Sequence, residues 1–383
     1  MSVSEPHGLS DTQWVPDILG ADYQNTTLLV PVRENTNTRS GGQPGEGARS
    51  SGSLSGATAA HTSEEPPLAD TYRATLIRHK PAASLARDYE PNGHAVLFIH
   101  GWSDYFFNTG LAEFFTERGY FFYALDLHNH GRSLGSPEMG GYVGNLADYD
   151  AEILAAHALI ARESMTNPGL PDPSREPAPG ADSQHPVILM GHSTGGLIAT
   201  LWAHHHPGLV SHLILNSPWL EIQGGAAIRR AASPLVQLAD LRPLMRMRVP
   251  ERSFYWRGIS SAAYGEWNVD RNLRPPHAFP VRAGWMKAIL AGQQEVAAGL
   301  KLPMPVLVLL AAKSMLGPVW SDLMLKADVV LDVRSLALRT LSLGNSVTLE
   351  RIDGALHEVF LSSKPVREDG YARLERWLRG YVD

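Results

Sequence analysis

The sequence of 383 residues contains no cysteine. This absence excludes a disulfide framework, a thiolate metal site and a cysteine nucleophile. Long apolar runs are also lacking. The strongest run, PVLVLLAA, has the length of a buried strand, and a membrane-spanning helix needs roughly 18 apolar residues. We therefore expect no integral membrane segment.

Positive charge is not in excess, because the formal net charge is −6. Without a basic face to bind phosphates, nucleic acid is not an expected partner. The N-terminus, MSVSEPHGLSDTQWVPD, lacks a basic region followed by an apolar run and does not match a secretory signal. The cytoplasm is therefore the expected location. With 44% hydrophobic and 19% charged residues, the composition predicts a globular protein with a substantial core.

Two segments have few large apolar side chains. Residues 34–70 are rich in Gly, Ser, Thr and Pro. Such a segment cannot offset the entropy lost on ordering by burying apolar surface, so we predict a flexible insertion. Residues 163–185 are rich in proline and are predicted to form a surface insertion.

The remainder alternates between strand-like apolar runs and helical patterns. The runs cover residues 26–32, 72–79, 94–101, 120–127, 186–193, 209–218, 305–312 and 347–354. Helical spacing occurs over 110–119, 145–162, 194–206 and near the C-terminus; in the second of these it places on one face Leu146, Tyr149, Ile153, Leu154 and Ile160. This alternation predicts an α/β fold with a mostly parallel central sheet and helices on both faces.

The same pattern suggests a domain organisation. Residues 1–33 form an N-terminal strand region, and residues 71–218 and 301–383 form the two parts of the core. The less regular block 219–300 is predicted to be a cap, inserted over the carboxyl edge of the sheet. Its aromatic side chains are expected to build the core of the cap, with a subset lining an apolar pocket.

The pattern G-x-S-x-G occurs twice, around Ser133 and around Ser193. Ser193 directly follows the apolar run PVILM and opens a helix, as a nucleophile in a sharp strand-to-helix turn does. Ser133 follows a loop and is followed by LGSPEMGG, which cannot start a helix. We therefore predict Ser193 as the nucleophile and Ser133 as a structural serine. His192 is expected to pack at the turn.

The general base must come late in the chain, because around such a turn the order is nucleophile, acid, base. Beyond residue 300 the only histidine is His357, immediately after the run VTLERI. An imidazole there can take the serine proton and return it to the leaving group.

The acid is less clearly marked. Ser314 stands where an aspartate is expected after PVLVLLAA, and residues 315–326 look like an insertion. Asp328 is favoured, because one helix and one strand fit between it and His357. Asp332 and then Asp322 remain alternatives.

Two backbone N–H groups must donate hydrogen bonds to the carbonyl oxygen that becomes negative during the reaction, from about 2.7–3.1 Å away. Thr194 follows the nucleophile at a helix N-terminus, and Trp102 follows His-Gly after the run HAVLFI. These two residues are the predicted donors. The run His204-His205-His206 lies where a helix ends before Pro207, so we expect it to interact with the helix C-terminus. No metal and no organic cofactor are implied.

The motifs HGWSD, DLHNHGRS, GHSTGG and IDGALHEV occur in this order. They resemble the monoacylglycerol lipase and lysophospholipase-like branch of the α/β-hydrolases, which is grouped with serine aminopeptidase S33. The resemblance covers residues 95–217 and 301–382, and residues 327–332 match the Ala-Asp-x-x-x-Asp of the family's acid loop. The family's Asp-x-Arg-Gly-His-Gly-x-Ser loses its arginine and one glycine in residues 126–133.

The resemblance implies an α/β-hydrolase fold with an inserted cap. It implies a serine hydrolase that cleaves carboxylic esters, such as monoacylglycerols or lysophospholipids, through an acyl-enzyme on Ser193. Ser193, Asp328 and His357 would form the triad, with Trp102 and Thr194 as oxyanion donors. The alternatives are an amide or peptide hydrolase or an acyltransferase on the same triad, because a fold does not fix the acyl group. A non-catalytic small-molecule binder is a further alternative.

Overall fold

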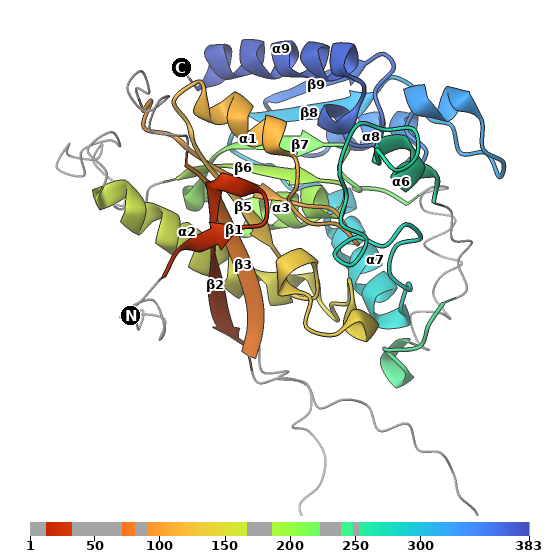
Figure 1. The fold of residues 1–383 in the computed structure, drawn as a ribbon, viewed down its shortest axis with the longest axis horizontal. Helices are drawn as coiled ribbons and strands as arrows, with labels where there is room; N and C mark the ends of the chain where they lie inside the picture. Colours follow the sequence, from red (N-terminus) through yellow and green to blue (C-terminus); the bar gives the residue numbers. More distant parts are fainter. Residues whose placement is uncertain are drawn as a thin grey trace, which may run out of the picture.

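The computed structural model describes residues 13–32, 71–80, 91–166, 186–222, 239–247 and 253–382. A nine-stranded sheet crosses these residues in the order β1-β2-β3-β5-β4-β6-β7-β8-β9 (Figure 1). The strands are β1 (Val15–Asp17), β2 (Gly20–Pro31), β3 (Thr71–His79), β4 (Ala95–Ile99), β5 (Phe121–Asp126), β6 (Val187–His192), β7 (Val210–Asn216), β8 (Val306–Ala311) and β9 (Val347–Ile352).

The sheet is parallel from β5 to β9 and antiparallel at its other edge. β4 lies between β5 and β6, and β7, β8 and β9 follow, all as parallel neighbours. β1, β2 and β3 pair antiparallel, and β3 is antiparallel to β5. The strands β4, β6 and β8 are buried along their whole length, as strands covered on both faces are. The predicted mostly parallel sheet is confirmed.

Helices cover both faces of the sheet. Successive residues of β4 point to opposite faces, so Leu97 belongs to one core cluster and Phe98 to the other. The first cluster includes buried side chains of α2 (Asp150–Thr166), α3 (Thr194–His205) and α7 (Ala283–Ala298). The second includes those of α1 (Thr109–Thr116) and α9 (Lys364–Tyr381), which lie together at the top of Figure 1. α8 (Val333–Thr340) follows the loop after β8.

The helix predicted over 145–162 begins and ends differently in the structure. A short 3-10 turn, η4 (Leu146–Tyr149), precedes α2, and Leu154 is only half-buried, unlike the other members of the predicted face. α2 runs to Thr166, so residues 163–166 are helical although composition assigned them to an insertion. Glu163 lies in this extension, and its carboxylate accepts hydrogen bonds from Tyr123 Oη at 2.8 Å and from Arg78 at 2.6 Å.

Residues 34–70 and the rest of the second predicted insertion lie outside the described residues. In the block 219–300 the described helices include α6 (Phe254–Ile259) and α7. Trp285, Ile289 and Val296 of α7 share the core cluster that contains the sheet. This block therefore packs into the main core through α7, and the boundaries of the cap stay a prediction.

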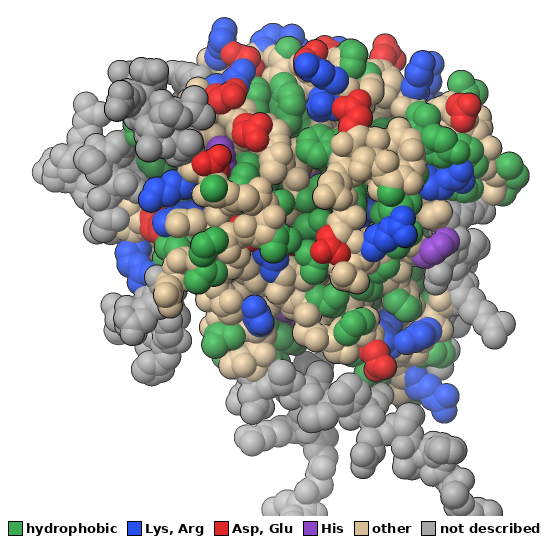
Figure 2. All heavy atoms as spheres, viewed as in Figure 1, with side chains coloured by type: hydrophobic (Ala, Val, Ile, Leu, Met, Phe, Trp, Pro, Cys, Tyr) green, Lys and Arg blue, Asp and Glu red, His purple; other side chains and the backbone are tan. Residues whose placement is uncertain are grey.

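The surface carries charges of both signs. On the face shown in Figure 2, basic and acidic side chains are interspersed with apolar ones, and the basic side chains do not gather into one large patch. Within the described ranges, no helix combines the length and the apolar character that crossing a bilayer requires.

Candidate active site

Ser193 occupies the turn between β6 and α3 with φ 53° and ψ −117°. A non-glycine residue rarely adopts a positive φ, and such strain is typical of functional turns. The surrounding chain holds this conformation. The Ser193 N–H donates to the main-chain oxygen of Asn216 at 3.1 Å, and the main-chain oxygen of Ser193 accepts from Trp219 N at 2.8 Å.

The two glycines of the motif permit close contact at this turn. A Cβ atom at Gly195 would lie 2.2 Å from the main-chain oxygen of His100, and one at Gly191 would lie 2.5 Å from the oxygen of Gly195. Neither position has room for a side chain. The spacing G-x-S-x-G is therefore a packing requirement of the turn.

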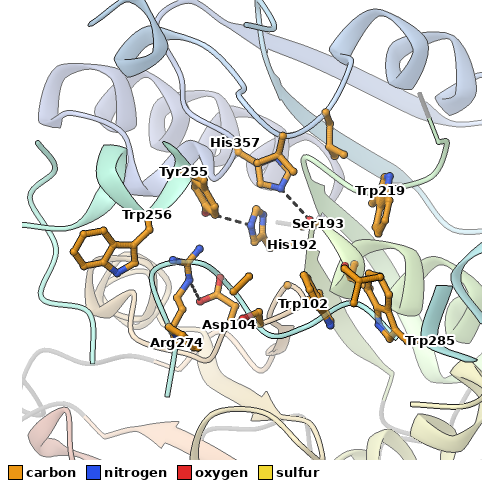
Figure 3. Close-up of a pocket in the computed structure, with 18 of the residues that line it drawn as sticks. Trp102, Asp104, His192, Ser193, Trp219, Tyr255, Trp256, Arg274, Trp285 and His357 are labelled. Carbon is orange, nitrogen blue, oxygen red and sulfur yellow. Dashed lines mark hydrogen bonds and ion pairs between the residues drawn. The ribbon is translucent and has the colours of Figure 1, made fainter. Parts of the chain in front are cut away.

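His357 lies between Ser193 and Asp328. Figure 3 labels His357 and Ser193. Its Nε2 is 2.9 Å from Ser193 Oγ, and its Nδ1 donates to Asp328 Oδ2 at 2.8 Å. The other carboxylate oxygen of Asp328 accepts from the N–H groups of Val330 at 2.7 Å and Leu331 at 2.8 Å. Asp328 and His357 are both buried. The structure thus brings together the three side chains that the sequence suggested as a triad.

The alternative residues have other surroundings. Asp332 caps α8, where it accepts from Arg334 N at 3.1 Å and from Ser335 Oγ at 2.6 Å, and these bonds lower its pKa. Asp322 is exposed at the start of η6 (Asp322–Lys326). Ser133 is buried beside β3, and its hydroxyl donates to the main-chain oxygen of Asp126 at 2.9 Å.

His192 lies beside the nucleophile and lines the same cavity (Figure 3). Its Nδ1 donates to the oxygen of Asn216 at 3.0 Å, and its Nε2 lies 3.5 Å from Tyr255 Oη. Burial, and then the neighbouring His357, hold the pKa of His192 well below its ordinary value. His192 is therefore neutral at physiological pH and supports the turn.

Thr194 and Trp102 both line the cavity at Ser193. Thr194 is the first residue of α3, where the helix dipole favours negative charge. The Trp102 indole donates to Gly141 O at 2.9 Å and packs against Trp285, with ring centroids 4.5 Å apart. Their roles as oxyanion donors stay a prediction.

The cavity at Ser193 has a volume of about 520 Å³, within the usual range for small-molecule sites. Its two sides differ in chemistry (Figure 3). One side is apolar and carries Trp102, Trp219 and Trp285. The other side carries Tyr255, Trp256 and the buried ion pair of Asp104 with Arg274.

Arg274 Nε donates to Asp104 Oδ1 at 2.8 Å, and the guanidinium lies 4.8 Å from the centre of the Tyr255 ring. Burial raises the pKa of Asp104, although the charge of Arg274 opposes this shift. Sequence reasoning missed Arg274. It lies in the irregular block far from Asp104 in the chain, so no local spacing marks the pair.

The histidine run at the end of α3 lies away from these residues. His205 Nε2 donates to Glu295 of α7 at 2.7 Å, and His206 Nε2 donates to Asp150 of α2 at 2.6 Å. His204 and His205 lie in the last turn of α3, where the sequence placed them for an interaction with the helix C-terminus, and these carboxylates, which the sequence did not suggest, are additional partners. His204, His205 and Glu295 are exposed, and their candidate ligand atoms lie within 4.8 Å of one another.

The sheet order and the strained serine after β6 define an α/β-hydrolase. Residues 90–363 match the family model described as serine aminopeptidase, S33. The chain belongs to this family, as the motifs predicted.

Known relatives agree with this membership. The chain is 25% identical over 278 residues to a monoacylglycerol lipase of Mycolicibacterium smegmatis, covering 71% of this chain and 84% of that protein. A monoacylglycerol lipase structure from Paleococcus ferrophilus superimposes with a TM-score of 0.53 at 18% identity, covering 76% of this chain and 96% of that one. A soluble variant of monoglyceride lipase from Saccharomyces cerevisiae, in complex with a substrate analogue, gives 0.54 at 13% identity, covering 97% and 96%. The two structures show the shared fold. Membership of this family makes the protein a serine hydrolase.

Proposed function

We propose that the protein cleaves carboxylic esters of lipid acyl chains, with Ser193 as nucleophile, His357 as general base and Asp328 as the acid that orients it. The observation that carries this proposal is the distance of 2.9 Å between Ser193 Oγ and His357 Nε2, together with 2.8 Å between His357 Nδ1 and Asp328. A nucleophile, a base and an orienting group in one hydrogen-bonded line are what acyl transfer requires.

In the proposed reaction, His357 takes the hydroxyl proton while Ser193 Oγ bonds to the carbonyl carbon. The carbonyl oxygen becomes negative and accepts hydrogen bonds from the N–H groups of Trp102 and Thr194. The bond to the alcohol then breaks, and the alcohol leaves with the proton from His357. Water repeats the sequence on the acyl-enzyme and releases the acid.

The two sides of the cavity support a lipid ester with a neutral polar alcohol, of the kind named for the monoacylglycerol lipase relative. The tryptophan side suits an acyl chain, because it is apolar. On the opposite side Asp104 cancels the charge of Arg274, while a guanidinium offers several N–H donors to hydroxyl oxygens. A phosphate there would compete with Asp104 for the Arg274 guanidinium, so monoacylglycerol is favoured over a lysophospholipid.

Labelling with a fluorophosphonate probe and a substrate panel test the proposal. The wild-type protein should be labelled and should hydrolyse p-nitrophenyl esters and monoacylglycerols, while Ser193→Ala should do neither. Ser133→Ala is the matched control and should keep its activity, because Ser133 lies beside β3. Hydrolysis by Ser193→Ala at the wild-type rate would overturn the proposal. Faster cleavage of the matched amide than of the ester would show that the protein is an amide hydrolase on the same triad.

A further inference from the structure

Asn216, the last residue of β7, is bonded to both halves of the candidate active site. Its main-chain oxygen accepts from Ser193 N at 3.1 Å and from His192 Nδ1 at 3.0 Å. β7 is the parallel neighbour of β6, with Asn216 opposite His192. The main chain of Asn216 therefore supports the turn that carries the nucleophile.

The side chain of Asn216 reaches the loop that carries the base. Its Oδ1 accepts from Val359 N at 3.2 Å, and its Nδ2 donates to the carboxyl group of Glu358. Glu358 directly follows His357. An amide has an acceptor and donors on one planar group, so one asparagine can make both bonds. Ser193 and His357 are thus connected through a single residue that touches each loop.

Glu358 is almost fully buried, with 4% of its surface exposed. Besides Asn216, its carboxyl accepts from Asn108 Nδ2 at 3.5 Å and from Phe360 N at 3.4 Å. Asn108 caps α1, where its Oδ1 accepts from Leu111 N at 3.2 Å. These donors are uncharged, and burial raises the pKa of Glu358 to about 8. A buried carboxyl without a cation is costly, so packing alone would be better served by an apolar residue.

We propose that Asn216 and Glu358 form a positioning pair that fixes His357 at hydrogen-bonding distance from Ser193. The inference rests on the proposed roles of Ser193 and His357. Neither member of the pair lines the cavity at Ser193, so they act through the two loops and not on substrate. The pair matters for rate because a displacement of about 1 Å between reacting groups can cost about 10²-fold.

The test compares Glu358→Met, which removes the acceptor, with Glu358→Gln, which keeps an oxygen for Asn216 Nδ2. Glu358→Met should lower kcat and the rate of fluorophosphonate labelling by about 10²-fold with little change in KM. Glu358→Gln should recover most of both rates. Ser164→Ala is the control for a lost buried hydrogen bond, since Ser164 Oγ donates to Ile160 O within α2 at 2.8 Å. Its kcat should stay at the wild-type value.

A second set of variants reverses the direction of the bond. Asn216→Asp is isosteric and keeps an acceptor for Val359 N, but it presents an oxygen to Glu358 in place of a donor. Assayed above about pH 8, where Glu358 has released its proton, it should slow kcat, and adding Glu358→Gln should restore the rate, because the glutamine amide then donates to the aspartate.

Equal kcat in Glu358→Met and Ser164→Ala, or no recovery in the double variant, would overturn the positioning role. A wild-type protein that the probe does not label would instead defeat the proposed function.

Discussion

Ser314 and Asp328 lie side by side in a short parallel bridge, although residues 315–326 separate them in the chain. Asp328 N donates to Lys313 O at 2.9 Å, and Met315 N donates to Asp328 O at 2.7 Å. The Ser314 hydroxyl donates to Leu331 O at 2.8 Å and accepts from Val333 N at 2.9 Å. The inserted segment leaves the end of β8 and returns to it, so Asp328 reaches the edge of the sheet where an acid is needed.

Replacing Asp328 and Asp332 separately should distinguish the two candidate acids. Asp328→Asn should lower kcat by about 10⁴-fold, because the amide favours the wrong imidazole tautomer. Asp332→Asn should leave kcat near the wild-type value, since asparagine also caps a helix well. Esterase assays on the purified variants check both outcomes. A large loss in Asp332→Asn alone would reassign the acid.

The sheet and the serine turn could be predicted because their signals are local. Apolar runs mark the buried strands, and the glycines at 191 and 195 mark a turn that excludes side chains. The sequence alone did not decide which of three aspartates is the acid. An inserted segment separates β8 from Asp328, so the number of residues after the strand no longer identifies the acid. The pairs Asp104–Arg274 and Asn216–Glu358 join residues that are far apart in the chain. Only the folded arrangement reveals such pairs.

Glu358 should make the protein less stable as pH rises. Its pKa is about 8 in the folded state against an ordinary value of 4.5, with burial as the main cause and the charge of Asp104 adding to it. Between these values the folded state holds a proton that the unfolded state has released. The contribution is therefore complete below about pH 4.5 and is lost as pH rises through about 8.

Urea unfolding from about pH 5 to about pH 9 measures this loss, and Glu358→Gln removes the titrating group. The free energy of unfolding should fall more steeply with pH in the wild-type protein than in the variant. Parallel curves for the two proteins would show that Glu358 does not hold its proton in the folded state.

Gly141→Ala should disturb the predicted oxyanion site through Trp102. A Cβ atom at Gly141 would lie 2.4 Å from Trp102 Nε1, whose indole donates to Gly141 O. The displaced indole should also shift the backbone N–H of Trp102, which is the predicted oxyanion donor. Loss of one oxyanion donor costs about 10²–10³-fold in kcat. A reduction in kcat of about tenfold or more is expected for partial displacement.

Gly20→Ala is the control, because Gly20 also has a positive φ, 120°, but a Cβ there meets nothing within 4 Å. It should share the backbone strain and keep its kcat. Equal kcat values in the two variants would argue against a role for Trp102.

The ion pair of Asp104 and Arg274 should determine which alcohols are accepted. Arg274→Met alone leaves a buried carboxylate without its cation, so we expect a loss of about 3–5 kcal/mol in the free energy of unfolding. Adding Asp104→Asn removes that charge and should recover much of the stability. The double variant should have a weaker preference for a monoacylglycerol over the ethyl ester of the same fatty acid, because the guanidinium donors to the glycerol hydroxyls are gone.

Trp285→Ala is the matched change on the other side of the cavity, where the indole packs against Trp102. It should alter the dependence of kcat/KM on acyl-chain length and leave the ratio of glycerol to ethyl ester unchanged. The two variants therefore separate the acyl side from the alcohol side in one matrix of substrates. If Trp285→Ala changed the alcohol preference and the double variant changed the chain-length preference, the ester would lie in the cavity in the opposite direction. In that orientation the apolar side of the cavity contacts the alcohol, and the ion pair of Asp104 and Arg274 contacts the acyl chain.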